Sequence, residues 1–172
     1  MKKIVFLFSF ALLVMSCMQT DATNKELTAI EYYNRGVVYV DLGKYQLALD
    51  DYSSAIRINP DYAKAYNNRG NIYNKLGKYQ PALDDYSRAI RINPDNPDYA
   101  IAYNNRGGVY VDLGKYQLAL DDYSSAIRIN PDDAKAYDNR GIVKWHLKLE
   151  YCNDFKRACD LGQCDNYNKG CK

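Results

Sequence analysis

Side chains that would share one helical face recur at spacings of three and four residues between positions 29 and 58. In the first half of this stretch they are Tyr32, Arg35, Gly36 and Tyr39, and in the second half Tyr45, Ala48, Leu49, Tyr52, Ala55 and Ile56. Such spacing is typical of amphipathic helices. Gly43 separates the halves and favours the left-handed turn that ends a helix. Pro60 follows the second half, where proline stops a helix. The pattern predicts two helices joined by a short turn.

The helix pair is repeated along the chain. Arg-Gly recurs at 35–36, 69–70, 106–107 and 140–141, at spacings of 34, 37 and 34 residues. Residues 36–61 and 107–132 differ at one position of 26, where Val37 corresponds to Gly108. A fixed period in this range indicates stacked helical units. We therefore predict an array over residues 28–161, divided into units 1 to 4 at 29–62, 63–99, 100–133 and 134–161.

Seven positions of the first three units carry large, small and proline residues in the same order. They are Tyr32, Gly36, Tyr39, Ala48, Tyr52, Ala55 and Pro60 in unit 1, then Tyr66, Gly70, Tyr73, Ala82, Tyr86, Ala89 and Pro94, and then Tyr103, Gly107, Tyr110, Ala119, Tyr123, Ala126 and Pro131. In this pattern the chain resembles the tetratricopeptide repeat (TPR) family. The resemblance implies an all-α fold, a right-handed solenoid of about four helix-turn-helix units.

Unit 4 departs from the pattern. Tyr137 and Gly141 are kept, but Lys144 stands where the other units have tyrosine, and the turn lacks its glycine. Two residues are also missing between Leu147 and Phe155. We interpret unit 4 as the closing unit of the array, since a terminal repeat has a face that no further unit covers.

The first residues have the features of an export signal. A basic start at Lys2 and Lys3 precedes an apolar run from Ile4 to Met15, which is too short to span a bilayer comfortably. Val14-Met15-Ser16-Cys17 resembles the lipobox of bacterial lipoproteins, in which the cysteine is acylated. The resemblance implies a signal peptide over 1–16, an acylated Cys17 that starts a polar tether over 17–27, and a location at the bacterial cell envelope. An ordinary cleaved signal, with Cys17 incidental, is the alternative.

The tail contains four cysteines at spacings of 7, 5 and 7 residues, Cys152, Cys159, Cys164 and Cys171. Cys152 and Cys159 would lie roughly 10.5 Å apart on one helix, too far to bond each other. If the chain reverses at Leu161-Gly162, Cys159 meets Cys164 and Cys152 meets Cys171. Four cysteines allow three pairings, and spacing alone does not decide among them.

A zinc site made of the four cysteines is the alternative, but the C-x2-4-C spacing usual for such sites is absent. An export signal favours disulfides. Residues 162–172 are therefore predicted to be a C-terminal cap held by disulfides. Ala158 to Gly162 is also similar to cysteine-rich Sel1-like repeats.

Composition excludes several kinds of chemistry. The net charge is +2, which gives no global field for nucleic acid, and one His cannot serve a site that needs two. There is no phosphate-binding glycine loop and no nucleophile elbow. Adjacent carboxylates recur at 50–51, 84–85 and 121–122, and we interpret them as a solvated helix face. The sequence predicts no catalytic residues, no metal site and no cofactor.

In the TPR family a concave groove is lined by the first helix of each unit. Carried over by position, the groove residues are Tyr33, Val37, Lys64, Asn67, Asn71, Asn74, Asn104, Asn105, Lys135, Asp138 and Trp145. The same rule gives Val40, Asp41, Lys75, Gly108, Val111, Asp112, Ile142 and His146. Amides can bond both donors and acceptors of an extended peptide, and Trp145 would be its aromatic anchor.

Some family members bind a peptide's terminal carboxylate with Lys, Asn, Asn, Lys and Arg. The equivalents here are Asn67, Asn71, Asn105, Lys135 and Asn139, so two cations are missing. The alternative is that the paired asparagines serve packing, and we favour it.

The resemblance implies a non-catalytic scaffold that binds a protein or peptide partner, held at a membrane by its lipid and not binding nucleic acid. One alternative is a structural assembly factor that uses the convex face or an array end. The other is an enzyme acting on cell-wall or antibiotic substrates, for which the chain offers no nucleophile with a base in reach.

Overall fold

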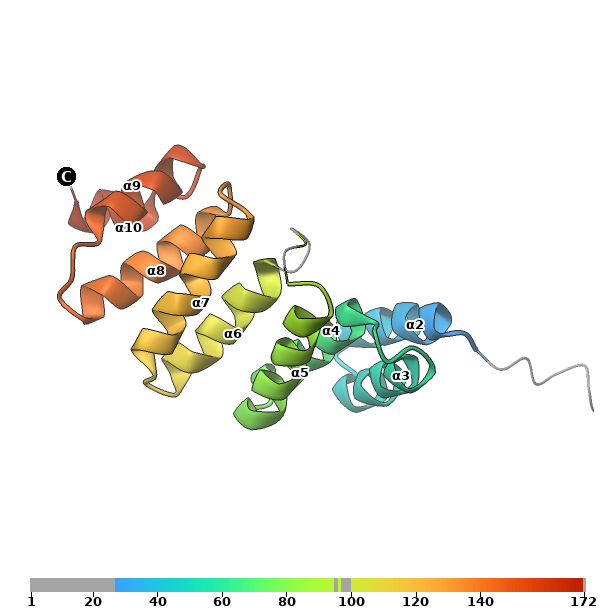
Figure 1. Cartoon of the computed structure of the whole chain (residues 1–172). Helices are drawn as coiled ribbons and strands as arrows, with labels where there is room; N and C mark the ends of the chain where they lie inside the picture. The colour runs from blue at the N-terminus through green and yellow to red at the C-terminus, as the bar shows by residue number, and fades with distance from the viewer. Residues whose placement is uncertain (1–26, 95, 97–99, 172) are drawn as a thin grey trace, which may run out of the picture.

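The computed structural model describes residues 27–94, 96 and 100–171, and every regular element among them is a helix. The predicted signal peptide and Cys17 lie outside the described residues. Successive helix pairs stack along one direction, so that the two ends of the array are far apart (Figure 1). The helices are α2 (Ala29–Asp41), α3 (Tyr45–Ile58), α4 (Ala63–Lys75), α5 (Tyr79–Ile92), α6 (Ala100–Asp112), α7 (Tyr116–Ile129), α8 (Ala134–His146), α9 (Cys152–Asp160) and α10 (Asp165–Gly170).

The all-α solenoid predicted from the repeat is confirmed. Each unit consists of a first helix packed on a second one, and the second helix then packs on the first helix of the next unit. Unit 1 begins with a capping box, in which the Glu31 N–H donates to Thr28 Oγ1 and the Thr28 N–H donates to Glu31 Oε2 at 2.8 Å. Because both orphan donors are satisfied, the chain enters α2 at a defined residue.

The turn inside each unit has one geometry. Gly43 has a φ of 69°, its N–H donates to the Val40 carbonyl at 2.9 Å, and the Lys44 N–H donates to the Tyr39 carbonyl at 2.8 Å. Gly77 and Gly114 have φ values of 69° and 68° at the same place. A residue with φ in this range ends a helix, and glycine adopts it without steric cost.

Unit 4 keeps this turn although the glycine is missing. Lys148 takes the left-handed conformation with a φ of 57°, and the Leu149 N–H donates to the Lys144 carbonyl at 2.9 Å. The loss of glycine is therefore not a loss of the turn, because Lys148 itself takes a conformation that costs about 1–2 kcal/mol.

A tyrosine from the second helix fills the space inside each pair. Tyr52, Tyr86 and Tyr123 are 1%, 1% and 2% exposed, and each ring lies against a glycine of the first helix. Unit 4 has Phe155 against Gly141 in the same arrangement. The glycines allow the close approach, since an added Cβ at any of these positions would meet the ring at 2.5 to 2.9 Å.

Branched residues of the first helices seal the joints between units. Ile72, Val109 and Val143 are 3%, 0% and 1% exposed because each packs on the second helix of the preceding unit. At the joint between units 1 and 2, Ile72 contacts Ala48, Leu49 and Tyr52. The core is therefore a series of similar clusters along the array rather than one central cluster.

We expect Gly107→Ala to lower the free energy of unfolding by about 1–3 kcal/mol, because its methyl group would lie 2.8 Å from the Tyr123 ring. Gly108→Ala is the matched control, since a Cβ there lies 4.0 Å from the nearest atom, the Tyr123 hydroxyl. It should raise stability by about 0.5–1 kcal/mol, the usual gain over glycine inside a helix. Urea denaturation followed by circular dichroism measures the stability of both variants. Equal changes in the free energy of unfolding would contradict the close approach of Gly107 to the Tyr123 ring.

Candidate peptide-binding groove

One arginine joins the two helices of every unit. Arg35 donates from Nε and Nη2 to the two carboxylate oxygens of Asp51, both at 2.7 Å. Such two-pronged pairing fixes geometry as well as adding energy. The corresponding pairs are Arg69–Asp85, Arg106–Asp122 and Arg140–Asp154, with distances from 2.7 to 3.0 Å.

The same arginine also reaches the preceding unit. Arg106 lies 5.6 Å from the Tyr103 ring and 5.9 Å from the Tyr110 ring, and its Nη1 donates to Ser87 Oγ at 2.9 Å. Arg69 and Arg140 make the equivalent bonds to serines of units 1 and 3, at 3.0 and 3.1 Å. The network therefore fixes both the pairing of helices within a unit and the register between units.

The interpretation of the adjacent carboxylates as a wholly solvated face is wrong for the second member of each pair. Asp51, Asp85 and Asp122 are 4%, 5% and 5% exposed, because each lies against the arginine of its own unit. The first members are exposed. The constant separation of 16 residues between arginine and aspartate was the sequence signal for this pairing.

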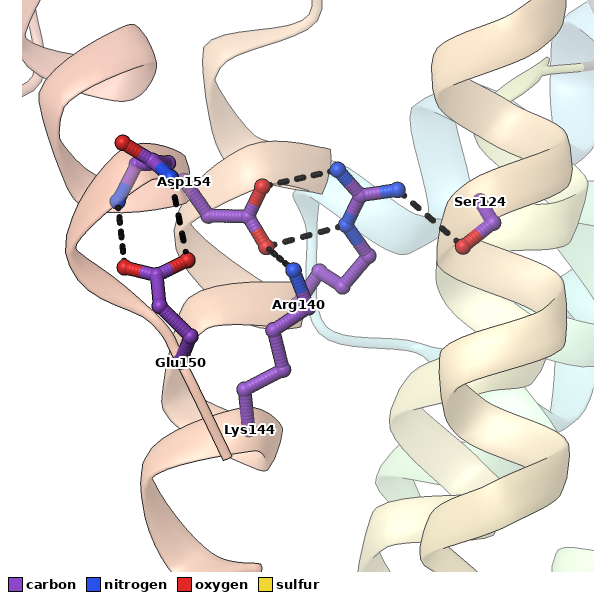
Figure 2. A network of polar contacts seen from close by, with 6 residues as sticks. Ser124, Arg140, Lys144, Glu150 and Asp154 are labelled. Atoms are coloured by element: carbon purple, nitrogen blue, oxygen red, sulfur yellow. Dashed lines mark hydrogen bonds and ion pairs between the residues drawn. The ribbon is translucent and has the colours of Figure 1, made fainter. Parts of the chain in front are cut away.

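Unit 4 adapts the network to its shorter second helix. Here the separation is 14 residues, and Lys144 also bonds Asp154, Nζ to Oδ2 at 2.8 Å (Figure 2). Burial alone would raise the pKa of Asp154, but hydrogen bonds and charge from Arg140 and Lys144 outweigh it and hold the pKa below its usual range. In unit 4, Lys144 thus stands where the other units have a tyrosine beside the arginine, and it places a second cation on the carboxylate.

The first helices of the units lie side by side. Helix α6 contacts both α4 and α8, a closer approach than the second helices α5 and α7 make to each other. The array therefore curves toward its first helices, whose inner face is called the groove below. Hollows lie in this groove near its N-terminal end and at its centre, and another lies at its C-terminal end.

The N-terminal hollow lies between units 1 and 2 and is lined by Val37, Val40, Tyr45, Tyr52, Asn68, Asn71, Ile72 and Lys75. The central hollow is lined by Asn74, Gly108, Val111, Asp112, Tyr123, Asn139, Ile142 and Val143. The terminal hollow lies where α8, α9 and α10 meet and is lined by Ile142, Trp145, Tyr151, Phe155, Asn166, Lys169 and Gly170. Each hollow combines apolar side chains with amides or a charge.

The buried tyrosines that line the first two hollows are uncharged at neutral pH. Burial raises the pKa of Tyr52 to about 12, with a hydrogen bond from Asn68 acting in the opposite direction. Burial likewise raises the pKa of Tyr123 to about 12. A ligand lying in the groove would therefore meet neutral phenols beneath it.

Several predicted groove asparagines bond one another across the joints. Asn105 Nδ2 lies 3.3 Å from Asn67 Oδ1 and 3.0 Å from Asn71 Oδ1, and Asn139 Nδ2 donates to Asn104 Oδ1 at 3.0 Å. Asn67 is only 8% exposed. These contacts fit the packing interpretation of the paired asparagines.

The remaining predicted residues fall into three environments. Tyr33 is half-buried, accepts from Asn68 Nδ2 at 3.1 Å, and its ring centroid is 5.0 Å from that of Tyr62. Lys64 and Lys135 are exposed at the first turns of α4 and α8. The predicted residues that line the three hollows are Val37, Val40, Asn71, Asn74, Lys75, Gly108, Val111, Asp112, Ile142 and Trp145. Asn104 and Lys135 line a further hollow beside Leu161.

Asp138 is covered by the chain itself. It is 6% exposed, and both of its carboxylate oxygens accept from Asn166 Nδ2 of α10, at 2.8 and 2.9 Å. The position therefore does not offer a carboxylate to a partner. Trp145 remains 56% exposed at the edge of the terminal hollow.

Sequence reasoning missed the part that α10 contributes. Asn166 and Lys169 line the terminal hollow with Tyr151 and Phe155, but the family pattern stops at residue 161. The cysteine spacing was the available signal, because a tail tied to α9 at two points must lie against the last unit.

The structure pairs Cys152 with Cys171 and Cys159 with Cys164, the nested arrangement among the three possible ones. All four tail sulfurs are thus engaged. In the described part of the chain no three His, Cys, Asp or Glu side chains are placed to hold a metal ion. Within the same residues, no helix has the length and apolar character needed to cross a bilayer.

The chain belongs to the tetratricopeptide repeat family. The Tetratricopeptide repeat profile matches residues 63–96 and 100–133, and a second profile, TPR repeat, matches residues 36–77. A comparison with curated protein sequences finds no significant match.

Solved structures show the same architecture. The first TPR domain of Spaghetti (RPAP3), bound to the HSP90 peptide SRMEEVD, is 27% identical, with a TM-score of 0.66 over 70% of this chain and 93% of that one. A crystal structure of MamA is 26% identical, with a TM-score of 0.72 over 86% of this chain and 83% of that one. Members of this family are generally non-catalytic interaction scaffolds.

We expect Asp122→Asn to lower the free energy of unfolding by about 2–3 kcal/mol, because it leaves Arg106 without its carboxylate in a largely buried position. Asp121→Asn changes the neighbouring, exposed residue and should have little effect. Thermal and urea unfolding of the two variants checks the difference. Equal stability of both would mean that the arginine network contributes nothing.

Proposed function

We propose that the protein is a non-catalytic scaffold at the bacterial cell envelope that binds an extended peptide segment of a partner protein in its groove. The observation that carries this proposal is the series of hollows along the first helices, from α2 to α8, lined by incompletely buried apolar and amide side chains. The similar Spaghetti domain holds a peptide, which supports the same use here.

The lining indicates the kind of segment that fits. In the N-terminal hollow Val37 and Val40 lie near Lys75, whose ammonium is 4.7 Å from the Tyr45 ring centroid. In the central hollow Val111 and Ile142 accompany Asn74 and Asp112. A strand that carries apolar side chains at intervals would bury them in the hollows, and the surrounding amides would bond its backbone.

The groove does not favour a strong clamp for a terminal carboxylate. Asn105 bonds both Asn67 and Asn71. Two asparagines, Asn67 and Asn139, stand at the positions of the two missing cations. Affinity would therefore depend mainly on apolar contacts and on the backbone of the bound segment.

Site-specific photocrosslinking in the producing cells tests the groove. A photoreactive residue at Val40 or Val111 is expected to give adducts with a partner protein, because both positions line hollows. The matched controls are Leu47 and Leu118, which occupy equivalent exposed positions on the second helices of the same two units, at 44% and 45% exposure.

Adducts at Leu47 and Leu118, with none at Val40 and Val111, would contradict groove binding and place the contact on the convex face. Adducts at all four positions would likewise oppose a specific groove site.

A second candidate, an assembly factor that uses the end of the array, is favoured by one observation. Val38 is 54% exposed, whereas its equivalents Ile72, Val109 and Val143 are covered by preceding units. Arg35 is also more exposed, at 46% of its side chain compared with 19% for Arg106. A photoreactive residue at Val38 would detect a partner at this end.

The envelope location rests on the N-terminal signal and on the tail. A basic start, an apolar run and a lipobox-like end at Cys17 are the features of exported lipoproteins. Two disulfides in the tail support an oxidising compartment. An acyl chain on Cys17 and a tether of residues 17–27 would confine the groove to the membrane surface, which raises its effective concentration there.

We expect Cys17→Ser to abolish acylation and to move the protein from the membrane fraction to the soluble fraction, because it removes the acylated thiol. Labelling with a clickable palmitate analogue and cell fractionation measure the two effects. The tail disulfides do not involve Cys17 and serve as the control for folding. A Cys17→Ser variant that is still membrane-bound and normally processed would contradict the lipoprotein proposal.

A further inference from the structure

The terminal hollow continues the groove to its C-terminal end. Ile142 lines both the central hollow and the terminal hollow, so the two are adjacent on α8. The terminal hollow has a volume of about 320 Å³, near the lower end of the roughly 300–1,000 Å³ of ligand pockets. That volume suits one large side chain of a peptide rather than a cofactor.

Three aromatic side chains, Trp145, Tyr151 and Phe155, form one part of its wall together with Ile142. Trp145 is 56% exposed, and Tyr151 meets Phe155 edge-on, with ring centroids 5.5 Å apart and an interplanar angle of 64°. Exposed tryptophan in a partly apolar hollow is the kind of residue that dominates peptide affinity. The wall therefore fits an apolar side chain.

Helix α10 contributes the polar part of the wall, Asn166 and Lys169. The amide nitrogen of Asn166 is committed to the two oxygens of Asp138. Lys169 carries the one charge among the described residues that line the terminal hollow. A cation beside aromatic rings complements an apolar side chain with a carboxylate next to it.

Helix α10 depends on its disulfides. It has six residues, none of them buried, and so contributes nothing to the core. Cys164, directly before it, is bonded to Cys159, and Cys171, directly after it, is bonded to Cys152. A helix this short is not stable by itself. Without the disulfides, only the Asn166–Asp138 contact and the packing of α10 on α9 would hold the polar wall.

We propose that the terminal hollow is a binding site for a large apolar residue followed directly by an acidic one in an extended peptide, and that the site exists only when the tail disulfides are formed. This inference rests on the proposed function, because it names the segment that the C-terminal end of the groove accepts. Trp145, Tyr151 and Phe155 bind the apolar side chain, and Lys169 pairs with the carboxylate.

The only tryptophan of the chain, Trp145, reports binding directly. The probe is the peptide acetyl-Gly-Phe-Asp-Gly-amide, titrated into purified protein of residues 18–172. A saturable change in Trp145 fluorescence is expected. A probe with Ala in place of Phe should bind about tenfold more weakly. A probe with Asn in place of Asp should bind several-fold more weakly and lose its salt dependence.

Protein variants test the two parts of the inference. Lys169→Gln should weaken the Phe-Asp probe several-fold and leave the Phe-Asn probe unchanged, whereas Lys156→Gln, an exposed lysine of α9 that does not line the hollow, should have no effect. The double variant Cys152→Ser, Cys171→Ser should lose most or all of its affinity for the Phe-Asp probe. Circular dichroism must show that helices α2–α9 of this double variant remain folded. If these helices unfold, Lys169→Gln still tests the terminal site.

Equal binding of the Phe and Ala probes, no effect of Lys169→Gln, or undiminished binding by a folded variant without the Cys152–Cys171 disulfide would each overturn the inference. Although the inference rests on the groove proposal, the two proposals can fail separately. Adducts at Val40 and Val111 without binding of the probe would support the groove proposal and reject the terminal site. Binding of the probe without adducts at Val40 and Val111 would reject the groove proposal.

Discussion

The regularity of the array depends on one ion pair that is repeated in every unit. Arg106 illustrates it, because a single guanidinium bonds Asp122 of its own second helix and Ser87 of the preceding unit. Tyrosine rings on both sides exclude water from the charge. The arginine therefore fixes both the angle between the two helices of a pair and the register between successive pairs. Both determine the shape of the groove. The many tyrosines of the chain, 18 against 4 phenylalanines, belong largely to this network and to the ring that packs on each glycine.

The period of the sequence was sufficient to predict the paired helices and the architecture, because each unit contacts mainly its neighbours. The contacts of particular side chains were harder to predict. Asp51 and Asp50 are chemically the same, and only the position of Arg35 across the helix pair makes one buried and the other exposed. The amides of Asn67 and Asn105 likewise bond each other because two first helices lie side by side. Neither relation is a property of a single helical face. Asp138 was assigned to the groove by family position, and that rule could not include α10, which lies beyond the repeat pattern.

The two ends of the array are closed by different means. At the N-terminal end, Glu31 stands where units 2 to 4 have the fully buried alanines Ala65, Ala102 and Ala136, so a further unit could not pack there with the internal geometry. Val38 nevertheless stays exposed at that end. At the C-terminal end two disulfides hold a short helix over the last unit. Covalent bonds thus replace the apolar contacts that a fifth unit would supply, and the cap adds polar walls to a groove that would otherwise end at α8.

The near-identity of units 1 and 3 also has a consequence for the kinetics of folding. Helices α3 and α7 have the same sequence, YQLALDDYSSAIRI, so during folding α2 has two chemically equivalent partners along one chain. Native pairing closes a turn of three residues, whereas pairing α2 with α7 would require a loop of more than seventy. Loop-closure entropy therefore favours the local partner. The three-residue turn with its left-handed glycine is what keeps identical helices from exchanging places, and between two chains at high concentration that advantage is smaller.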